Sequence, residues 1–147
     1  MTITDEAGNH TELTLAAVTV KVDSVGPRVK LVLPKNKHSV RAFRTIKGKA
    51  TDTGGTGVKN VTVKAIEKRG TFWYGYNAKT KTWLKAATKT KALAKARVAV
   101  VRTNSRHVWA VTLKGLRKGT LVYRAFAKDK VANKSATLTH TATLTRR

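Results

Sequence analysis

Short runs in which apolar and polar residues alternate recur along most of the chain, and they constrain the fold more than any other feature. Val, Thr, Leu and Ala dominate these runs, and Gly, Asn, Asp or Pro separate them. A period of two places alternate side chains on opposite faces, so each run predicts a β-strand with one buried face. The residues predicted to face inward are Val29, Leu31, Leu33, Ile46, Gly48, Ala50, Val61, Val63, Ala65, Trp109, Val111, Leu113, Leu121, Tyr123, Ala125 and Ala127.

About seven such runs lie between residue 26 and residue 147, which predicts an all-β antiparallel β-sandwich. A further strand is predicted over residues 11–22, after the hairpin tip "TDEAGN". The Ala/Lys-rich residues 85–100 are interpreted as a solvated excursion of strand and loop with at most one helical turn. The alternative for this stretch is a helix or a basic, DNA-binding type of tail.

The order of the motifs resembles the bacterial immunoglobulin-like domains that occur in tandem in secreted and cell-surface proteins. The matching stretches are "GPRVKLVLP", "IKGKATDTGGTGVKNVTV", "FWYGYNAKTKTWLKAAT" and "VWAVTLKGLRKGTLVYRAFAKDKVANKS". The resemblance covers residues 26–147 as one module and implies an immunoglobulin-like sandwich. Two positions depart from the family pattern, because Ala132 stands where the family has Gly and Leu121 stands where Tyr is usual.

Residues 1–25 resemble the last strand and exit linker of a preceding module, the rest of which is missing. We therefore expect this chain to be the C-terminal piece of a longer tandem array. The alternative is a short protein whose extra strand pairs with the edge of its own sheet, since a lone strand has no ladder partner.

The charge of the chain is strongly positive and unevenly distributed. The net charge is +24, and residues 28–147 carry 30 Lys and Arg against three acids. Such a field attracts polyanions of any kind, and a spread of lysines favours an anionic wall polymer or polysaccharide over sequence-specific readout of DNA. The candidate polyanion-binding residues are Lys47, Lys49, Lys64, Lys85, Lys89, Lys91 and Lys95.

Catalytic and metal-binding patterns are lacking in the sequence. There is no cysteine, the four histidines are scattered, and no serine lies in a Gly-x-Ser-x-Gly elbow. The glycines of "GGTGVK" lack the Gly-Lys-Ser/Thr ending of a phosphate-binding loop. We therefore expect no enzyme activity and no cofactor. No apolar run of 18 residues occurs, so we expect no transmembrane segment.

Two further groups of residues allow a functional and a structural interpretation. Asp52, Asp129 and Asn133, with Asp5, offer oxygen ligands for calcium, but calcium takes six to eight oxygens, so we favour turn capping and expect no metal. Tyr74 and Tyr76 share a strand face and could stack sugars or bases. The favoured alternative is a hairpin whose aromatic pairs cover the edge of the sandwich.

Two classes of function remain. The favoured class is a non-catalytic structural or adhesive module of a secreted or cell-surface protein, and the resemblance alone implies that extracellular location. Its expected partners are an anionic cell-wall polymer, a polysaccharide or neighbouring immunoglobulin-like modules. The alternative is a nucleic-acid-binding protein that uses the basic surface without sequence preference.

Overall fold

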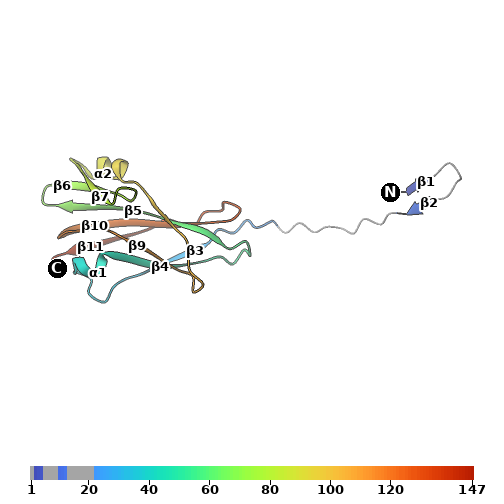
Figure 1. The fold of residues 1–147 in the computed structure, drawn as a ribbon, viewed down its shortest axis with the longest axis horizontal. Coiled ribbons are helices and arrows are strands. Elements are labelled where there is room, and N and C mark those ends of the chain that lie inside the picture. The colour runs from blue at the N-terminus through green and yellow to red at the C-terminus, as the bar shows by residue number, and fades with distance from the viewer. Residues whose placement is uncertain (1, 5–9, 13–21) are drawn as a thin grey trace.

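Two antiparallel sheets form a β-sandwich in the computed structural model of the chain, which describes residues 2–4, 10–12 and 22–147 (Figure 1). The prediction of an all-β sandwich is therefore confirmed. The smaller sheet has the order β3-β4-β9 and consists of β3 (Arg28–Val32), β4 (Thr45–Thr51) and β9 (Val108–Thr112).

The larger sheet has the order β11-β10-β5-β6-β7, and the short strand β8 also pairs with β5. The two sheets hold nine strands where about seven were expected, because the aromatic hairpin has a second strand, β7, and because the Ala/Lys-rich excursion ends in the short strand β8. The strands of this sheet are β5 (Val58–Arg69), β6 (Phe72–Asn77), β7 (Thr82–Ala86), β8 (Ala99–Val101), β10 (Gly119–Asp129) and β11 (Leu138–Leu144).

The core between the sheets is built from the alternate residues that the sequence pattern selected. Trp109 and Tyr123 are each 1% exposed and contribute its largest side chains. The Trp109 ring lies against the backbone of Gly48, where any Cβ atom would collide with it. Leu33 was predicted wrongly, because it lies beyond the end of β3 and is exposed.

A short helix, α1 (Val40–Phe43), covers one end of this core. The Ser39 hydroxyl caps the helix by accepting a hydrogen bond from the Ala42 N–H. Val40 and Phe43 are buried in the core, and this places the arginines beside them at the rim.

The Ala/Lys-rich stretch contains a real helix, α2 (Lys89–Lys95), where at most one turn was expected. The Thr88 hydroxyl caps it, and Ala92 and Ala96 pack on the outer face of the larger sheet against Ile66. Gly75 permits this contact, because a Cβ there would meet the Ala92 carbonyl. The contact of Ala92 and Ala96 with Gly75 therefore determines where α2 lies on the sheet. The lysines of the helix are exposed.

Residues 2–4 and residues 10–12 pair with each other. Strands β1 (Thr2–Thr4) and β2 (His10–Glu12) form a separate two-stranded antiparallel sheet, as expected for strands that flank a hairpin tip. The predicted strand over residues 11–22 is seen only at its start, in β2, and residues 13–21 lie outside the described residues. Residues 22–27 contain no strand and lead into β3.

Candidate functional site

The seven predicted polyanion-binding lysines lie on two different faces of the sandwich. Lys47 and Lys49 are exposed on β4, on the outer face of the smaller sheet. Lys64 is half-buried on β5, where it lies opposite Arg124 of β10. The remaining four belong to β7 and α2 and are exposed: Lys85, Lys89, Lys91 and Lys95. The structure therefore does not gather the predicted set into one site.

The aromatic side chains of β6 are largely occupied by other groups. Tyr76 is 3% exposed, its hydroxyl donates to the Thr112 carbonyl oxygen at 3.1 Å, and its ring contacts Trp83. Its ring is inaccessible, so the hypothesis that Tyr76 stacks a ligand is wrong. Tyr74 is half-buried, and the Arg69 guanidinium lies over its ring at 4.6 Å. Lys85 covers Phe72 in the same way, at 3.5 Å.

Three aspartates meet at the end of the sandwich where residues 22–27 enter, and we call this the acidic end. Carboxylate oxygens of Asp23, Asp52 and Asp129 lie within 4.8 Å of one another. The sequence interpretation included Asp52 and Asp129 but assigned Asp23 to the linker of a preceding module. Asp5 lies outside the described residues.

Hydrogen bonds from nearby loops already engage these carboxylates. Asp52 accepts from the Gly54 and Gly57 N–H groups, at 3.0 and 2.6 Å. Asp129, which is fully buried, accepts from the backbone N–H groups of Val131 and Asn133. These are the contacts of carboxylates that cap turns.

Asp23 joins residues 22–27 to the sandwich. Its Oδ2 accepts a 2.6 Å hydrogen bond from the Thr56 hydroxyl, and its carbonyl oxygen accepts from the Asn133 side-chain amide. The Thr56 hydroxyl, followed by the Val25 N–H, holds the pKa of Asp23 below its ordinary value of 3.8. Three carboxylates could supply a cation with only part of the six to eight oxygens that calcium needs, so turn capping accounts for the geometry best.

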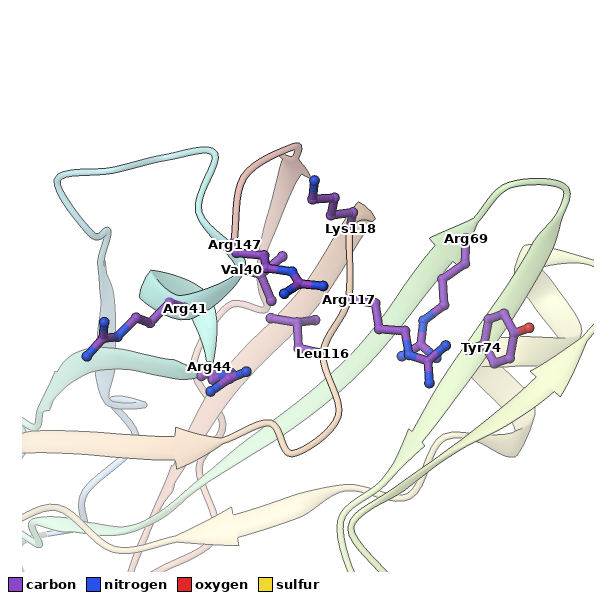
Figure 2. Close-up of a pocket in the computed structure, with 9 residues that line it drawn as sticks. All are labelled: Val40, Arg41, Arg44, Arg69, Tyr74, Leu116, Arg117, Lys118 and Arg147. Carbon is purple, nitrogen blue, oxygen red and sulfur yellow. The ribbon is translucent and has the colours of Figure 1, made fainter.

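A cavity of about 780 Å³ lies at the opposite end of the sandwich, and we call it the arginine pocket (Figure 2). Helix α1, the loop between β9 and β10, the adjoining ends of β5 and β6, and the last residue of the chain form its walls. Strand β5 connects the two ends, since Val58 pairs with Asp129 and Arg69 closes the strand at the pocket. The lining residues are Val40, Arg41, Arg44, Arg69, Tyr74, Leu116, Arg117, Lys118 and Arg147.

The cations of this pocket are spread around Leu116. Figure 2 shows the guanidinium groups of Arg69 and Arg117 together beside Tyr74, the guanidinium of Arg147 next to Leu116, and Arg44 on the far side of Leu116 from Tyr74. Arg41 points away from these groups. Leu116 is buried, and its apolar side chain lies between Arg44 and the pair of Arg69 and Arg117.

One buried acid, Glu67, accepts hydrogen bonds from two residues that line the pocket. Glu67 is fully buried, its Oε2 accepts from the Arg69 Nε at 2.6 Å, and its Oε1 accepts from the Arg117 N–H at 2.9 Å. Burial raises the pKa of Glu67 above its ordinary value, while the Arg117 N–H and the Arg69 charge act in the opposite direction. Arg69 also donates to the Gly115 carbonyl, so Glu67 fixes one guanidinium and the pocket loop.

Sequence reasoning did not anticipate the arginine pocket or the contribution of Asp23 to the acidic end. The lining cations are scattered between residues 41 and 147, and no local motif connects them. The sequence did contain one signal for the pocket, because most of the cations at this end of the sandwich are arginines although lysine is the commoner cation in the chain.

Comparisons with family models, with curated proteins and with solved structures give no match to this chain. In the described part of the chain, no helix has the length and apolar character needed to cross a membrane.

Proposed function

We propose that the chain is a non-catalytic, immunoglobulin-like module of a secreted or cell-surface protein, whose basic surface binds anionic polymers. The module catalyses no reaction and serves as a structural or adhesive unit. Its expected partners are an anionic wall polymer or polysaccharide, or neighbouring immunoglobulin-like modules.

The strand order supports the immunoglobulin-like part of the proposal. In such domains the first, second and fifth strands share one sheet, while the third, sixth and seventh share the other. The same division occurs here if β6, β7 and β8 are treated as an insertion after the third strand. The smaller sheet then holds β3, β4 and β9, and the larger sheet holds β5, β10 and β11 side by side.

The binding proposal rests on one observation: few of the described Lys and Arg side chains are paired with an acid. Within the described residues, the one ion pair joins Arg69 to Glu67. Most other Lys and Arg side chains extend into solvent from both sheets and from α2. A polyanion would release its condensed counterions on contact with this surface, which is the main driving force for binding of such polymers.

The test is a titration of the whole chain with three long polymers at several salt concentrations, centred on about 150 mM, where the Debye length is about 8 Å. The polymers are random DNA, a DNA pool after selection, and an anionic glycopolymer. All three are expected to bind with affinities that fall steeply with salt. Changing Lys47 and Lys49 to Gln should reduce the slope of log affinity against log salt by about 0.9 for each lysine that contacts a phosphate.

Two results would contradict this function. The first is an enriched DNA motif bound about a thousandfold or more above random DNA, which is the range of a specific DNA-binding protein. The second is a lack of measurable binding to any of the three polymers at low salt.

A further inference from the structure

The residue types of the arginine pocket differ from those of the rest of the surface. The chain has 20 lysines and 11 arginines, yet five arginines and one lysine line the pocket. A guanidinium presents a planar fork of donors that matches the oxygens of phosphate, whereas an ammonium acts as a point charge. The excess of arginine indicates a site for oxyanions and not only a solvated basic surface.

Most of these guanidinium groups have no partner within the protein. Arg69 is held by Glu67, by the Gly115 carbonyl oxygen and by the ring of Tyr74. Among the described residues, the other five lining cations make no ion pair and no side-chain hydrogen bond: Arg41, Arg44, Arg117, Lys118 and Arg147. Like charges gathered around one cavity repel one another, so a bound anion would relieve a cost that the free protein carries.

The size of the cavity and the arrangement of its charges define the ligand further. A volume of about 780 Å³ falls in the range of small-molecule sites and exceeds what one phosphate needs. Arg44 is separated from the pair Arg69 and Arg117 by the apolar side chain of Leu116, and the guanidinium of Arg147 lies next to that side chain (Figure 2). The ligand that fits has two anionic groups joined by a compact scaffold, which would lie over Leu116.

The surroundings of the pocket favour a ligand without nucleobases. Proteins that bind single-stranded nucleic acid stack the bases on exposed aromatic rings. Tyr74 is the aromatic residue of the pocket, and Arg69 already covers one face of its ring. The nearby Trp83 also has the Arg69 guanidinium over its ring, at 5.3 Å, and its indole N–H donates to the Lys114 carbonyl oxygen.

We propose that the arginine pocket is a discrete binding site for two linked phosphate groups, as in the repeating unit of a polyol-phosphate polymer. One phosphate binds at Arg117, beside the held guanidinium of Arg69, and the other binds at Arg44, with Arg147 next to the scaffold that joins them. The choice of a polymer unit rests on the proposed function, whereas the existence of an oxyanion site rests on the pocket alone.

The test is calorimetric titration of the whole chain with four small probes at about 150 mM salt, where only close contacts remain effective. The probes are inorganic phosphate, pyrophosphate, a short glycerol-phosphate oligomer and a dinucleotide. The oligomer is expected to bind one site per chain and more tightly than inorganic phosphate or the dinucleotide.

The decisive variant combines Arg44→Ala with Arg117→Ala, which removes one exposed guanidinium from each side of Leu116. Its matched control combines Arg102→Ala with Arg106→Ala, which removes the same charge from two exposed arginines in the loop before β9. The pocket variant should lose about tenfold or more in affinity for the oligomer, because each lost contact is a charge-assisted hydrogen bond. The control variant should change by less than about twofold, as expected for distant exposed charges. Arg117→Lys should behave like Arg117→Ala if the fork geometry matters.

The outcomes separate this site from the general function. If both double variants weaken the oligomer equally, or if no small probe binds while long polymers still do, the pocket proposal fails and the polymer-binding function stands. If pyrophosphate and the oligomer bind at the pocket but long polymers do not, the general function fails and the pocket stands. Tighter binding of the dinucleotide than of the oligomer would overturn the assignment to a base-free phosphate chain.

Discussion

The two ends of the sandwich both concentrate charge in loops, but they use that charge in different ways. At the acidic end, the carboxylates of Asp52 and Asp129 each accept hydrogen bonds from backbone N–H groups of their own loops. At the arginine pocket, Glu67 engages Arg69, while Arg44 and Arg117 extend into an open cavity. A cluster of charges therefore indicates a binding site only where its hydrogen-bonding capacity is not already used by the fold.

The largest expected effect comes from the one acid at the pocket end. Replacing Glu67 with Ala leaves the Arg69 guanidinium and the Arg117 N–H without their buried partner. The free energy of unfolding should fall by about 3 kcal/mol, at the lower limit for a broken buried pair because Arg69 is partly exposed. Urea denaturation measures the loss. A loss below about 1 kcal/mol would show that Glu67 does not support the pocket.

The pH dependence of the same residue has a defined sign. Because burial raises the pKa of Glu67 in the folded state, the folded protein binds this proton more tightly than the unfolded chain does. Protonated Glu67 stabilises the folded protein fully at pH values below its ordinary pKa of 4.5. This contribution to the free energy of unfolding is lost as the pH rises through the raised pKa of the folded state. Stability relative to Glu67→Gln should therefore decline as the pH rises through this window. An increase with pH would mean that the attraction of Arg69 outweighs the cost of burial.

At the acidic end, Asp129→Ala should cost about 2 kcal/mol, because two backbone N–H groups and the Asn133 amide lose a buried, charged acceptor. The same denaturation experiment applies. If the acidic end serves only to cap turns, added calcium should leave the melting temperature of the unaltered protein unchanged. A rise with calcium that Asp129→Ala abolishes would make this end a cation site and would remove the contrast with the pocket.

A smaller gain is expected at the turn that follows Asp129. Ala132 adopts a φ of 72°, in the left-handed region that disfavours residues with a Cβ atom. Ala132→Gly should stabilise the protein by about 0.5–1 kcal/mol, because relief of this strain exceeds the greater flexibility of glycine in the unfolded chain. Thermal melting measures the gain. Ala136→Gly, in the following loop, is a control that should not stabilise the protein.

Much of the fold could be predicted from the sequence because alternation is a local property. The strand phases of β4, β5, β9 and β10 follow from a period of two, and the predicted burial of Trp109 is confirmed. Helix α2 was only the alternative interpretation of its stretch, because its own residues do not fix its position. Its position depends on Ala92 lying against Gly75, a contact between segments that the sequence pattern does not connect.

The candidate sites were less predictable because they depend on topology. Arg44, Arg69 and Arg117 come together only because β4, β5 and β10 begin or end at the same edge of the two sheets. The composition indicates an excess of cations. It does not indicate which cations are spread over two faces, as the predicted lysines are, and which surround one cavity, as the pocket arginines do. Asp23 was assigned to a linker by its position in the chain, although it contacts Thr56 in the loop before β5.

The smallest expected effect on stability belongs to the unpartnered cations of the pocket. Arg44→Ala and Arg117→Ala should each change the free energy of unfolding by no more than about 0.5 kcal/mol, because exposed side chains without partners contribute little to folding. At low salt the variants should be slightly more stable than the unaltered protein, since each removes repulsion among like charges. This difference in the free energy of unfolding should shrink as salt screens the charges of the pocket. Denaturation at low and high salt measures both effects, with Lys47→Ala as the control for a distant exposed charge. If Arg117→Ala instead destabilised the protein by more than about 1 kcal/mol at every salt concentration, its guanidinium would be part of the fold, as the carboxylate of Asp129 is. The two ends would then use their charges in the same way, and the pocket would lose the unmet hydrogen-bonding capacity on which its ligand depends.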